Sequence, residues 1–257
     1  IKSGYFEIPK TISIHHSFSK SKNDKISFTF NLFNKANIIF IKNSKKNSQI
    51  TFGLLPPKIE ERHQDFYVIK IFPKEIIIES ESEKGRFYAI NTLSQLFSYY
   101  QAKGSIPCME IKDSPKFQWR GMHLDVSRHF FPKEFIKKYI DYLAMYKMNT
   151  FHWHLTDDQG WRSEIKKYPK LTEVGAWRAR SMIGRYKDDQ YEEKKYGGFY
   201  TQEDIKEIVK YASERHITIV PEIEMPGHAS AAIAAYPELG CTGQQIKVAE
   251  KWGVFDD

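Results

Sequence analysis

The sequence is poor in cysteine and has no long hydrophobic run. Its 2 cysteines, Cys108 and Cys241, lie far apart, so they provide neither a disulfide framework nor the close spacing of a metal-binding motif. The longest apolar runs, 38–41 and 76–78, are much shorter than the ~20 residues that cross a bilayer as a helix. We therefore expect unpaired cysteines and no transmembrane segment.

Charge of one sign is not concentrated in any part of the chain. The formal net charge is +7, but the lysines are spread along the sequence and interleaved with acidic stretches such as 79–83. Nucleic-acid binding would require a basic stripe along one element, and no such stripe is seen. A hydrophobic content of 41% is sufficient for a sizeable core. These features favour a globular protein with a lysine-rich surface and no nucleic-acid partner.

Residues 1–114 have the pattern of a small α+β domain. Short apolar segments between Asn, Ser, Lys and Pro turns predict strands, which cover 26–32, 38–41, 49–54, 67–72 and 75–79. Residues 85–100 carry apolar side chains at three- and four-residue steps, which predicts a helix that packs across the sheet. We interpret 104–115, with two prolines and a glycine, as the exit from this domain.

From 115 to 257 strands and helices alternate, which predicts an α/β fold with parallel strands. The predicted strands cover 119–126, 150–155 and 217–223. Helices are expected from Pro132 to Met148 and after Thr201, where Asp204 completes a capping box. The connection 156–200 is too long for an ordinary βα turn, so we expect it to be functional or to contain short helices.

Polar residues that a core does not require follow each of these three strands. They are Asp125 and Arg128, then His154 and Asp157, then Glu222, Glu224 and His228. Barrels and doubly wound sheets both carry their sites at the carboxyl ends of parallel strands. The sequence therefore predicts one site at that edge of the sheet.

The segment 151–162 combines acids, histidines, an arginine and tryptophans, a mixture typical of the wall of a sugar pocket. Because side chains alternate along a strand, Trp153 should face the helices while His152 and His154 point to the opposite face. Trp161 lies in the loop that follows, and it is the best candidate for a platform under a sugar ring. We interpret the segment as part of a carbohydrate site.

Several roles stay open at the level of single residues. Arg128 could hold two vicinal hydroxyls or a carboxylate in a fork, or it could form a structural salt bridge to Asp125 or Asp157. Asp157 and Asp158 are adjacent, so one is expected to work outward while the other braces the loop. His228 follows a proline and a glycine, and it could relay a proton or simply bond to the backbone.

Three segments occur in the order of a known family. They are 120–128 (RGMHLDVSR), 152–162 (HWHLTDDQGWR) and 221–228 (PEIEMPGH). Together they resemble glycoside hydrolase family 20, the β-N-acetylhexosaminidases. The resemblance implies a (β/α)8 TIM barrel, incomplete in this chain, with about three β/α units over 115–257. Residues 1–114 would be the small α+β domain that precedes the barrel.

The resemblance also implies a chemistry. In this family the 2-acetamido oxygen of the substrate attacks the anomeric carbon, so hydrolysis is retaining without an enzyme nucleophile. Arg128 would bind the hydroxyls at C3 and C4 of the terminal sugar, and His154 would support the substrate site from the second strand. Asp157 and His228 would form a catalytic relay to the acid/base glutamate. No cofactor and no metal are implied.

One departure from the family limits what this chain can do. The catalytic Asp-Glu pair of the family lies in a His-x-Gly-Gly-Asp-Glu segment after the fourth strand, and the present sequence contains no such segment. The pairs Asp157-Asp158 and Asp256-Asp257 stand in other contexts. We therefore expect the acid/base to lie outside this chain and the chain alone to be inactive.

The expected partner is a glycan or glycoconjugate with a terminal N-acetylhexosamine, either GlcNAc or GalNAc. No signal peptide is seen and the chain starts at Ile1, which leaves export open. The expected location is secreted, periplasmic or at the cell surface. Two other hypotheses stay open. One is a non-catalytic carbohydrate-binding protein, and the other is a metallohydrolase with His152 and His154 as ligands.

Overall fold

The computed structural model describes residues 3–15, 38–42, 49–55, 63–253 and 255. The chain divides into two compact units, Ile1–Gln118 and Trp119–Asp257, and each is described by itself. The predicted strand at 26–32 lies outside the described residues. Within the described part of the chain, every helix is too short or too polar to cross a membrane.

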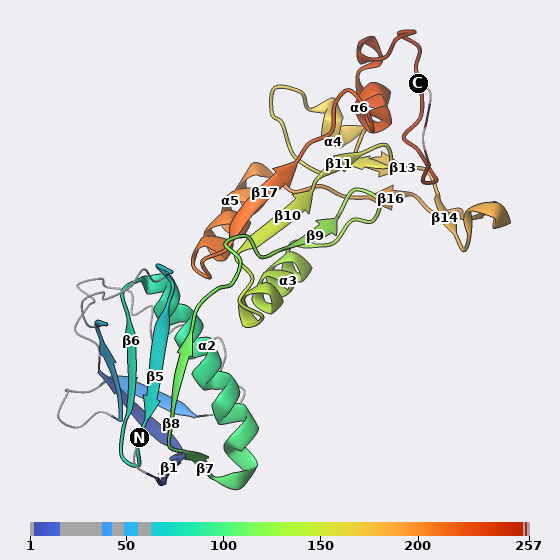
Figure 1. The fold of residues 1–257 in the computed structure, drawn as a ribbon. Helices are drawn as coiled ribbons and strands as arrows, with labels where there is room; N and C mark the ends of the chain where they lie inside the picture. The colour runs from blue at the N-terminus through green and yellow to red at the C-terminus, as the bar shows by residue number, and fades with distance from the viewer. Residues whose placement is uncertain (1–2, 16–37, 43–48, 56–62, 254, 256–257) are drawn as a thin grey trace. The chain divides into compact units, whose positions relative to one another are not determined.

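A mixed six-stranded sheet in the order β3-β2-β4-β6-β5-β8 forms the first unit (Figure 1). Its strands are β2 (Thr11–His15), β3 (Ile39–Lys42), β4 (Ile50–Gly53), β5 (Tyr67–Ile71), β6 (Ile76–Ser80) and β8 (Met109–Asp113). β5 pairs antiparallel with β6 and β8, and the other pairs are parallel. The strands predicted at 38–41, 49–54, 67–72 and 75–79 are confirmed. Their isoleucines bury one face of the sheet.

The interpretation of 104–115 as a simple exit is wrong. This segment forms β7 (Ser105–Pro107), which pairs antiparallel with β1 (Tyr5–Glu7), and then β8 at the edge of the large sheet. Prolines are tolerated at strand ends and edges, so they do not exclude a strand here. The Tyr67 hydroxyl donates a hydrogen bond to Asp113 at 2.5 Å and so ties the end of β8 to β5.

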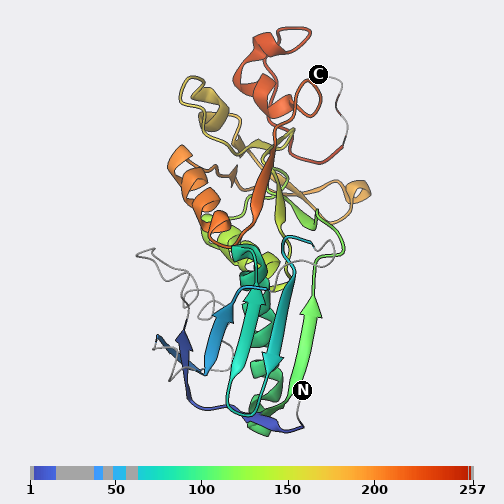
Figure 2. The same cartoon turned by 60° about the vertical axis from the view of Figure 1, so that its left-hand side comes forward.

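Helix α2 (Glu83–Tyr100) lies against one face of this sheet (Figure 2) and contacts β5 and β6. It begins at Ser82, whose side chain accepts a hydrogen bond from the Gly85 amide at 2.8 Å. Phe87, Leu93 and Phe97 are buried on its inner face. The predicted helix is therefore confirmed, with a start two residues earlier than expected.

Three parallel strands in the order β17-β10-β9 form the sheet of the second unit (Figure 1). They are β9 (Gly121–Asp125), β10 (Thr150–His154) and β17 (Thr218–Glu222). In the register of the sheet, His154 at the end of β10 stands opposite Asp125 on one side and Glu222 on the other. The carboxyl ends of all three strands are therefore level.

Two helices cover one face of this sheet. α3 (Lys133–Met145) follows Pro132, and α5 (Gln202–Ser213) begins with the predicted capping box of Thr201 and Asp204, which is confirmed. The two helices contact each other. Phe151 and Trp153 of β10 are buried, and the Phe151 ring contacts Tyr139 of α3 at 5.4 Å between centroids. His152 and His154 consequently point to the other face, as the alternation predicted.

The long connection after β10 folds into short paired strands. β11 (Thr156–Asp157) pairs with β12 (Gly160–Trp161), β13 (Trp177–Arg178) with β16 (Tyr196–Gly197), and β14 (Ser181–Ile183) with β15 (Gln190–Glu192). A short helix, α4 (Lys170–Glu173), lies among them, and α6 (Ser230–Ala235) follows β17. The connection therefore builds a layer of loops beyond the carboxyl ends of the strands.

Arg162 holds this layer together from the inside. Its guanidinium is fully buried and donates hydrogen bonds to backbone carbonyls of Val126, Ser127, Gln159, Ala176 and Gly198. Burial, reinforced by the nearby charge of Arg178, lowers the pKa of Arg162 to about 10, so the group stays charged at neutral pH. A Cβ on Gly160 would come within 2.2 Å of this guanidinium, which explains why glycine occupies that position.

Candidate functional site

Asp157 is the centre of the predicted site. Its carboxylate is buried, and Oδ2 lies 2.9 Å from Nε2 of His154 and forms an ion pair with Nη1 of Arg128. Oδ1 accepts a hydrogen bond from the Asp158 amide at 2.7 Å and lies 3.4 Å from Nδ1 of His228. The structure thus brings Arg128, His154, Asp157 and His228 together at the carboxyl ends of the strands.

Arg128 is fixed by two carboxylates. Nη1 lies 3.0 Å from Asp125 Oδ2 and also contacts Asp157, so both salt bridges that the sequence left open are formed. Asp125 in turn accepts hydrogen bonds from the amides of Ser127 and Arg128, which shapes the turn after β9. The Arg128 side chain is still 35% exposed, so a rigidly held guanidinium faces the space beyond the strands.

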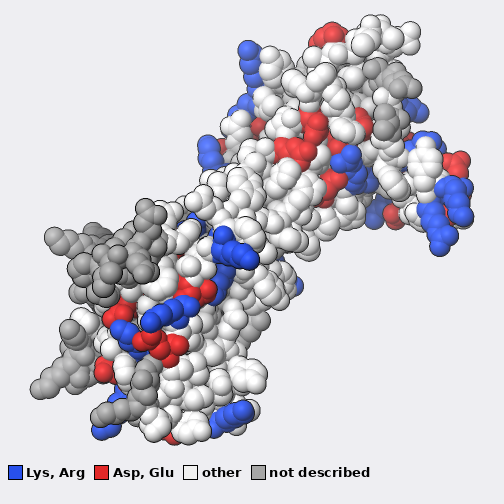
Figure 3. All heavy atoms as spheres, in the orientation of Figure 1, with Lys and Arg blue, Asp and Glu red and all other residues white. Residues whose placement is uncertain are grey.

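A pocket of about 700 Å³ opens beside this guanidinium. Its lining includes Asp125, Arg128, Arg178 and Trp252, and Trp252 is 59% exposed. Figure 3 shows acidic and basic side chains side by side over the ends of the three strands. A pocket with a fixed arginine, a carboxylate and an accessible aromatic ring can bind a polyhydroxylated ring by hydrogen bonds and stacking.

Asp157 and Asp158 were expected to divide their roles, one working outward and the other bracing the loop, and both side chains are buried. Asp158 Oδ1 accepts hydrogen bonds from the amide and the hydroxyl of Ser230, at 3.1 and 2.9 Å. Its backbone carbonyl accepts a further hydrogen bond from Ala249. Asp158 therefore fastens the β11–β12 turn to the start of α6, while Asp157 faces the charged groups of the site.

His228 lies over both aspartates. Nδ1 is 3.3 Å from Asp158 Oδ2 and 3.4 Å from Asp157 Oδ1, and the side chain is 43% exposed. The residue adopts a left-handed conformation with φ 54°, which follows the turn at Gly227. The ring thus contacts both carboxylates, and its role in a proton relay stays a prediction. The exposed ring can receive a proton from, or give one to, a group above it.

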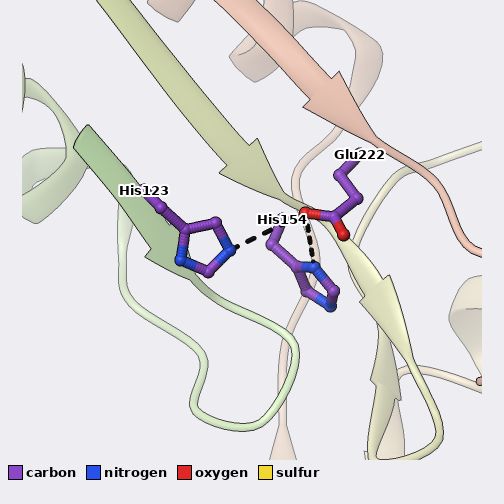
Figure 4. A group of neighbouring side chains, drawn as sticks. All are labelled: His123, His154 and Glu222. Carbon is purple, nitrogen blue, oxygen red and sulfur yellow. Dashed lines mark ion pairs between the residues drawn. The ribbon is translucent and has the colours of Figure 1, made fainter. Parts of the chain in front are cut away.

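A second cluster surrounds Glu222, next to the first (Figure 4). Its Oε2 lies 2.7 Å from Nδ1 of His154, 2.6 Å from Nε2 of His152 and 3.7 Å from Nε2 of His123. The sequence predicted the position of His152, but it gave no sign that His123 belongs here. His123 stands directly opposite His152 in the register of the sheet, which only the pairing of β9 with β10 reveals.

The pKa values of His154, Glu222 and Glu224 depend on the contacts between these side chains. Burial opposes a charge on His154, but its hydrogen bonds with Asp157 and Glu222 outweigh burial and raise the pKa of His154 to about 8. Burial also opposes the charge of Glu222, yet contact with His154 holds the pKa of that carboxyl well below its usual range. The hydrogen bond with Glu222 raises the pKa of Glu224. At neutral pH the pair therefore consists of an imidazolium and a carboxylate.

The expectation that Trp161 forms a sugar platform is wrong. Trp161 is only 4% exposed and packs with Leu171, Ala231 and Val248 in a core beneath the loops. Its Nε1 donates a hydrogen bond to the Ser163 carbonyl at 2.6 Å. The accessible aromatic residue at the pocket is Trp252, which the sequence analysis missed because no motif surrounds it.

Comparisons with known families cover almost the whole chain. The family model described as "Glycosyl hydrolase family 20, catalytic domain" matches residues 117–257, and the model described as "Glycosyl hydrolase family 20, domain 2" matches residues 2–114. The chain is 47% identical over 201 residues to a beta-hexosaminidase of Porphyromonas gingivalis, covering 76% of this chain and 25% of the relative. It is 49% identical over 174 residues to a beta-hexosaminidase of Vibrio furnissii, and this match covers 67% of this chain and 28% of the relative.

Solved structures agree with this similarity. The beta-N-acetylhexosaminidase of Bacteroides fragilis is 37% identical, with a TM-score of 0.76. The match covers 99% of this chain and 48% of the Bacteroides chain. A mutant Streptomyces plicatus beta-hexosaminidase in complex with product GlcNAc is 30% identical, with a TM-score of 0.80. The match covers 98% of this chain and 49% of the Streptomyces chain. The chain spans 25–34% of the length of the first curated relatives and less than half of these solved chains.

Proposed function

The chain belongs to glycosyl hydrolase family 20, and we propose that the protein carrying it is a retaining exo-β-N-acetylhexosaminidase. It would release terminal GlcNAc or GalNAc from glycans. The observation that supports this most is the cluster of Arg128, Asp157, His154 and His228 beside an open pocket, within a match to the family's catalytic domain. The relatives that carry the name beta-hexosaminidase support the same activity.

We propose that the three β/α units are the first part of a (β/α)8 barrel whose remaining units lie outside this chain. Their level carboxyl ends, with His154 between Asp125 and Glu222, would form one wall of the site. The catalytic Asp-Glu pair would come from a later strand. On this proposal the 257 residues alone give no turnover. We also propose that the complete protein is secreted, periplasmic or at the cell surface.

The proposed reaction proceeds in two steps. First the 2-acetamido oxygen of the substrate attacks the anomeric carbon, while the acid/base glutamate protonates the departing glycosidic oxygen, and an oxazolinium forms. Water then attacks the same carbon and gives its proton to the glutamate, which restores the acetamido group and the β configuration. The residues of this chain act on the bound sugar and on the proton of that glutamate.

Arg128 is proposed to bind the C3 and C4 hydroxyls of the terminal sugar. Two carboxylates hold its Nη1, so the guanidinium is positioned before substrate arrives and little side-chain entropy is lost on binding. The planar guanidinium can donate two parallel hydrogen bonds to neighbouring hydroxyl oxygens of the sugar, whereas the ammonium of a lysine would offer one point of contact. The same group would bind substrate and transition state alike, so its removal should act mainly on KM.

Asp157 and His228 are proposed to relay charge to the acid/base glutamate. The buried carboxylate lies 3.4 Å from Nδ1 of His228, and the half-exposed ring can contact a group above the sheet. His154 supports Asp157 from β10 at 2.9 Å. A charged relay of this kind adjusts the proton affinity of the glutamate, which must act first as acid and then as base.

Turnover by the complete protein tests the proposal. 4-Nitrophenyl N-acetyl-β-D-glucosaminide should be hydrolysed, whereas the β-glucoside, which lacks the acetamido nucleophile, should not. Equal hydrolysis of both substrates would rule out substrate-assisted catalysis. Tight binding of a thiazoline inhibitor without turnover would instead favour the non-catalytic carbohydrate-binding protein. Loss of hydrolysis on chelation, restored by added metal, would favour a metallohydrolase.

A further inference from the structure

The face of the sheet opposite the helices carries histidines on two neighbouring strands and a glutamate on the third. His152 stands opposite His123 in the register of β10 and β9, and His154 stands opposite Glu222 in the register of β10 and β17. Side chains two residues apart on a strand share a face, so His152 and His154 point the same way. Strand pairing, rather than the conformation of a loop, therefore brings these groups together.

We propose that His123, His154 and Glu222 form a binding site for a transition-metal dication, Zn²⁺ in the first instance, with His152 as a neighbouring fourth donor. Each of the three residues offers one ligand atom, and these atoms all lie within 4.8 Å of one another. Figure 4 shows the two imidazole rings turned toward the carboxylate from β9 and β10. This site goes beyond the proposed hydrolysis, for which no metal is expected.

The distances are those of a site that closes on an ion by small side-chain movements. Ligand atoms at about 2.0–2.2 Å from a tetrahedral Zn²⁺ lie roughly 3.3–3.6 Å from one another. Around Glu222 Oε2 the observed separations are 2.7 Å to His154 Nδ1 and 3.7 Å to His123 Nε2, which lie on either side of that value. His152 Nε2, at 2.6 Å from the same oxygen, is within reach of the same ion.

The remaining nitrogen of His154 supports this assignment independently. Nε2 lies 2.9 Å from the buried carboxylate of Asp157, so a metal on Nδ1 leaves an N–H that donates to a carboxylate. Metal-bound histidines are held in this way in most proteins, because the outer carboxylate fixes the tautomer and makes the ring a better ligand. Asp157 would therefore position His154 for metal and keep its contact with Arg128.

The donor set also indicates which ions fit. Two or three imidazoles with one carboxylate suit Zn²⁺, Co²⁺ or Ni²⁺, whereas Mg²⁺ and Ca²⁺ prefer oxygen ligands. Glu222 supplies one negative charge, which offsets part of the charge of the dication.

Calorimetric titration of the chelator-treated complete protein with ZnCl₂ alone tests the site, and no substrate is present. We expect binding of one ion, with the affinity reduced roughly 10–100-fold by His123→Ala and by Glu222→Gln. His216→Asn is the matched control, since His216 has φ 57°, a conformation that asparagine tolerates, and lies outside the cluster. Its affinity should equal that of the wild type.

Co²⁺ absorption gives a second measurement that does not depend on stability. Visible bands of a four-coordinate ion should appear in the wild type and in His216→Asn, and they should be lost in His123→Ala although its circular dichroism is unchanged. Absence of Zn²⁺ binding by the wild type, or equal affinity in His123→Ala and Glu222→Gln, overturns the proposal. Because neither readout involves substrate, hydrolysis of β-GlcNAc without metal binding would overturn this inference alone.

Discussion

Nε2 of His154 lies 2.9 Å from Oδ2 of Asp157, and both side chains are buried. The other nitrogen of the same ring lies 2.7 Å from Glu222. One imidazole therefore joins the cluster around Arg128 to the cluster around Glu222. A change in the charge of either carboxylate will therefore alter the electrostatic environment of the other through His154.

Replacing Arg128 by alanine should destabilise the fold as well as the site. The Asp157 carboxylate is fully buried, and Arg128 is the guanidinium among the three side chains, Arg128, His154 and His228, that contact it, so its removal leaves a buried charge poorly compensated. Breaking such a pair costs about 3 kcal/mol of unfolding free energy. Arg180→Ala is the control, because Arg180 pairs with Glu193 and Glu250 near the surface, where solvent screens the charges, so that its removal should change stability little. Equal losses in urea unfolding of the two variants would contradict this account.

Gly160→Ala should be strongly destabilising. The added methyl group would lie 2.2 Å from the Arg162 guanidinium, which is enclosed by the carbonyls that it binds and cannot move away without breaking hydrogen bonds. Overpacking of this kind costs about 1–3 kcal/mol. Gly227→Ala is the matched control, since a Cβ there meets nothing within 4 Å. Thermal unfolding compares the two, and a Gly160→Ala protein as stable as the control would disprove the central role of Arg162.

Much of the site could be predicted because it depends on strand periodicity. Parallel strands end level with one another, so polar residues after each strand, such as Asp125, His154 and Glu222, meet at one edge whatever the loops do. The capping box of Thr201 and Asp204 was predictable for a similar reason, since it involves residues three positions apart and no tertiary contact.

Other features depend on contacts between distant segments, which local patterns do not contain. Trp161 is buried because α6, some seventy positions later in the chain, packs against it. Asp158 is drawn inward by Ser230 at the start of the same helix. His123 becomes part of a cluster only through the register of β9 with β10. Strand β8 was missed because its partner, β5, lies far back in the sequence.

Asp157→Asn in the complete protein should move the alkaline limb of the kcat/KM profile to lower pH. Loss of this negative charge removes a group that, through His228, favours protonation of the acid/base glutamate. Profiles should be recorded with a chelator present, so that metal does not contribute. Glu214→Gln, at the end of α5 and away from the site, should keep the wild-type profile. An unshifted limb in Asp157→Asn removes Asp157 from the relay.

Acid should weaken the start of α5 through Asp204. The hydrogen bond from Lys133 lowers the pKa of Asp204, with further help from Thr201. Since the folded pKa is below the unfolded value, the stabilisation is present above about pH 4 and is lost as the pH falls through the folded pKa. Both Asp204→Asn and Lys133→Met should therefore lose less unfolding free energy than the wild type on acidification. Urea unfolding at several pH values checks this, and parallel curves for all three proteins would contradict it.

The kinetic constants of the complete protein on 4-nitrophenyl N-acetyl-β-D-glucosaminide, measured beside those of Arg128→Lys, test the central claim most directly. Lysine keeps the charge that Asp157 requires but lacks the planar fork proposed to bind the sugar hydroxyls. We predict hydrolysis by the wild type and a KM about tenfold or more higher in Arg128→Lys, with folding retained. No hydrolysis by the wild type, or an unchanged KM in the variant, would contradict the account.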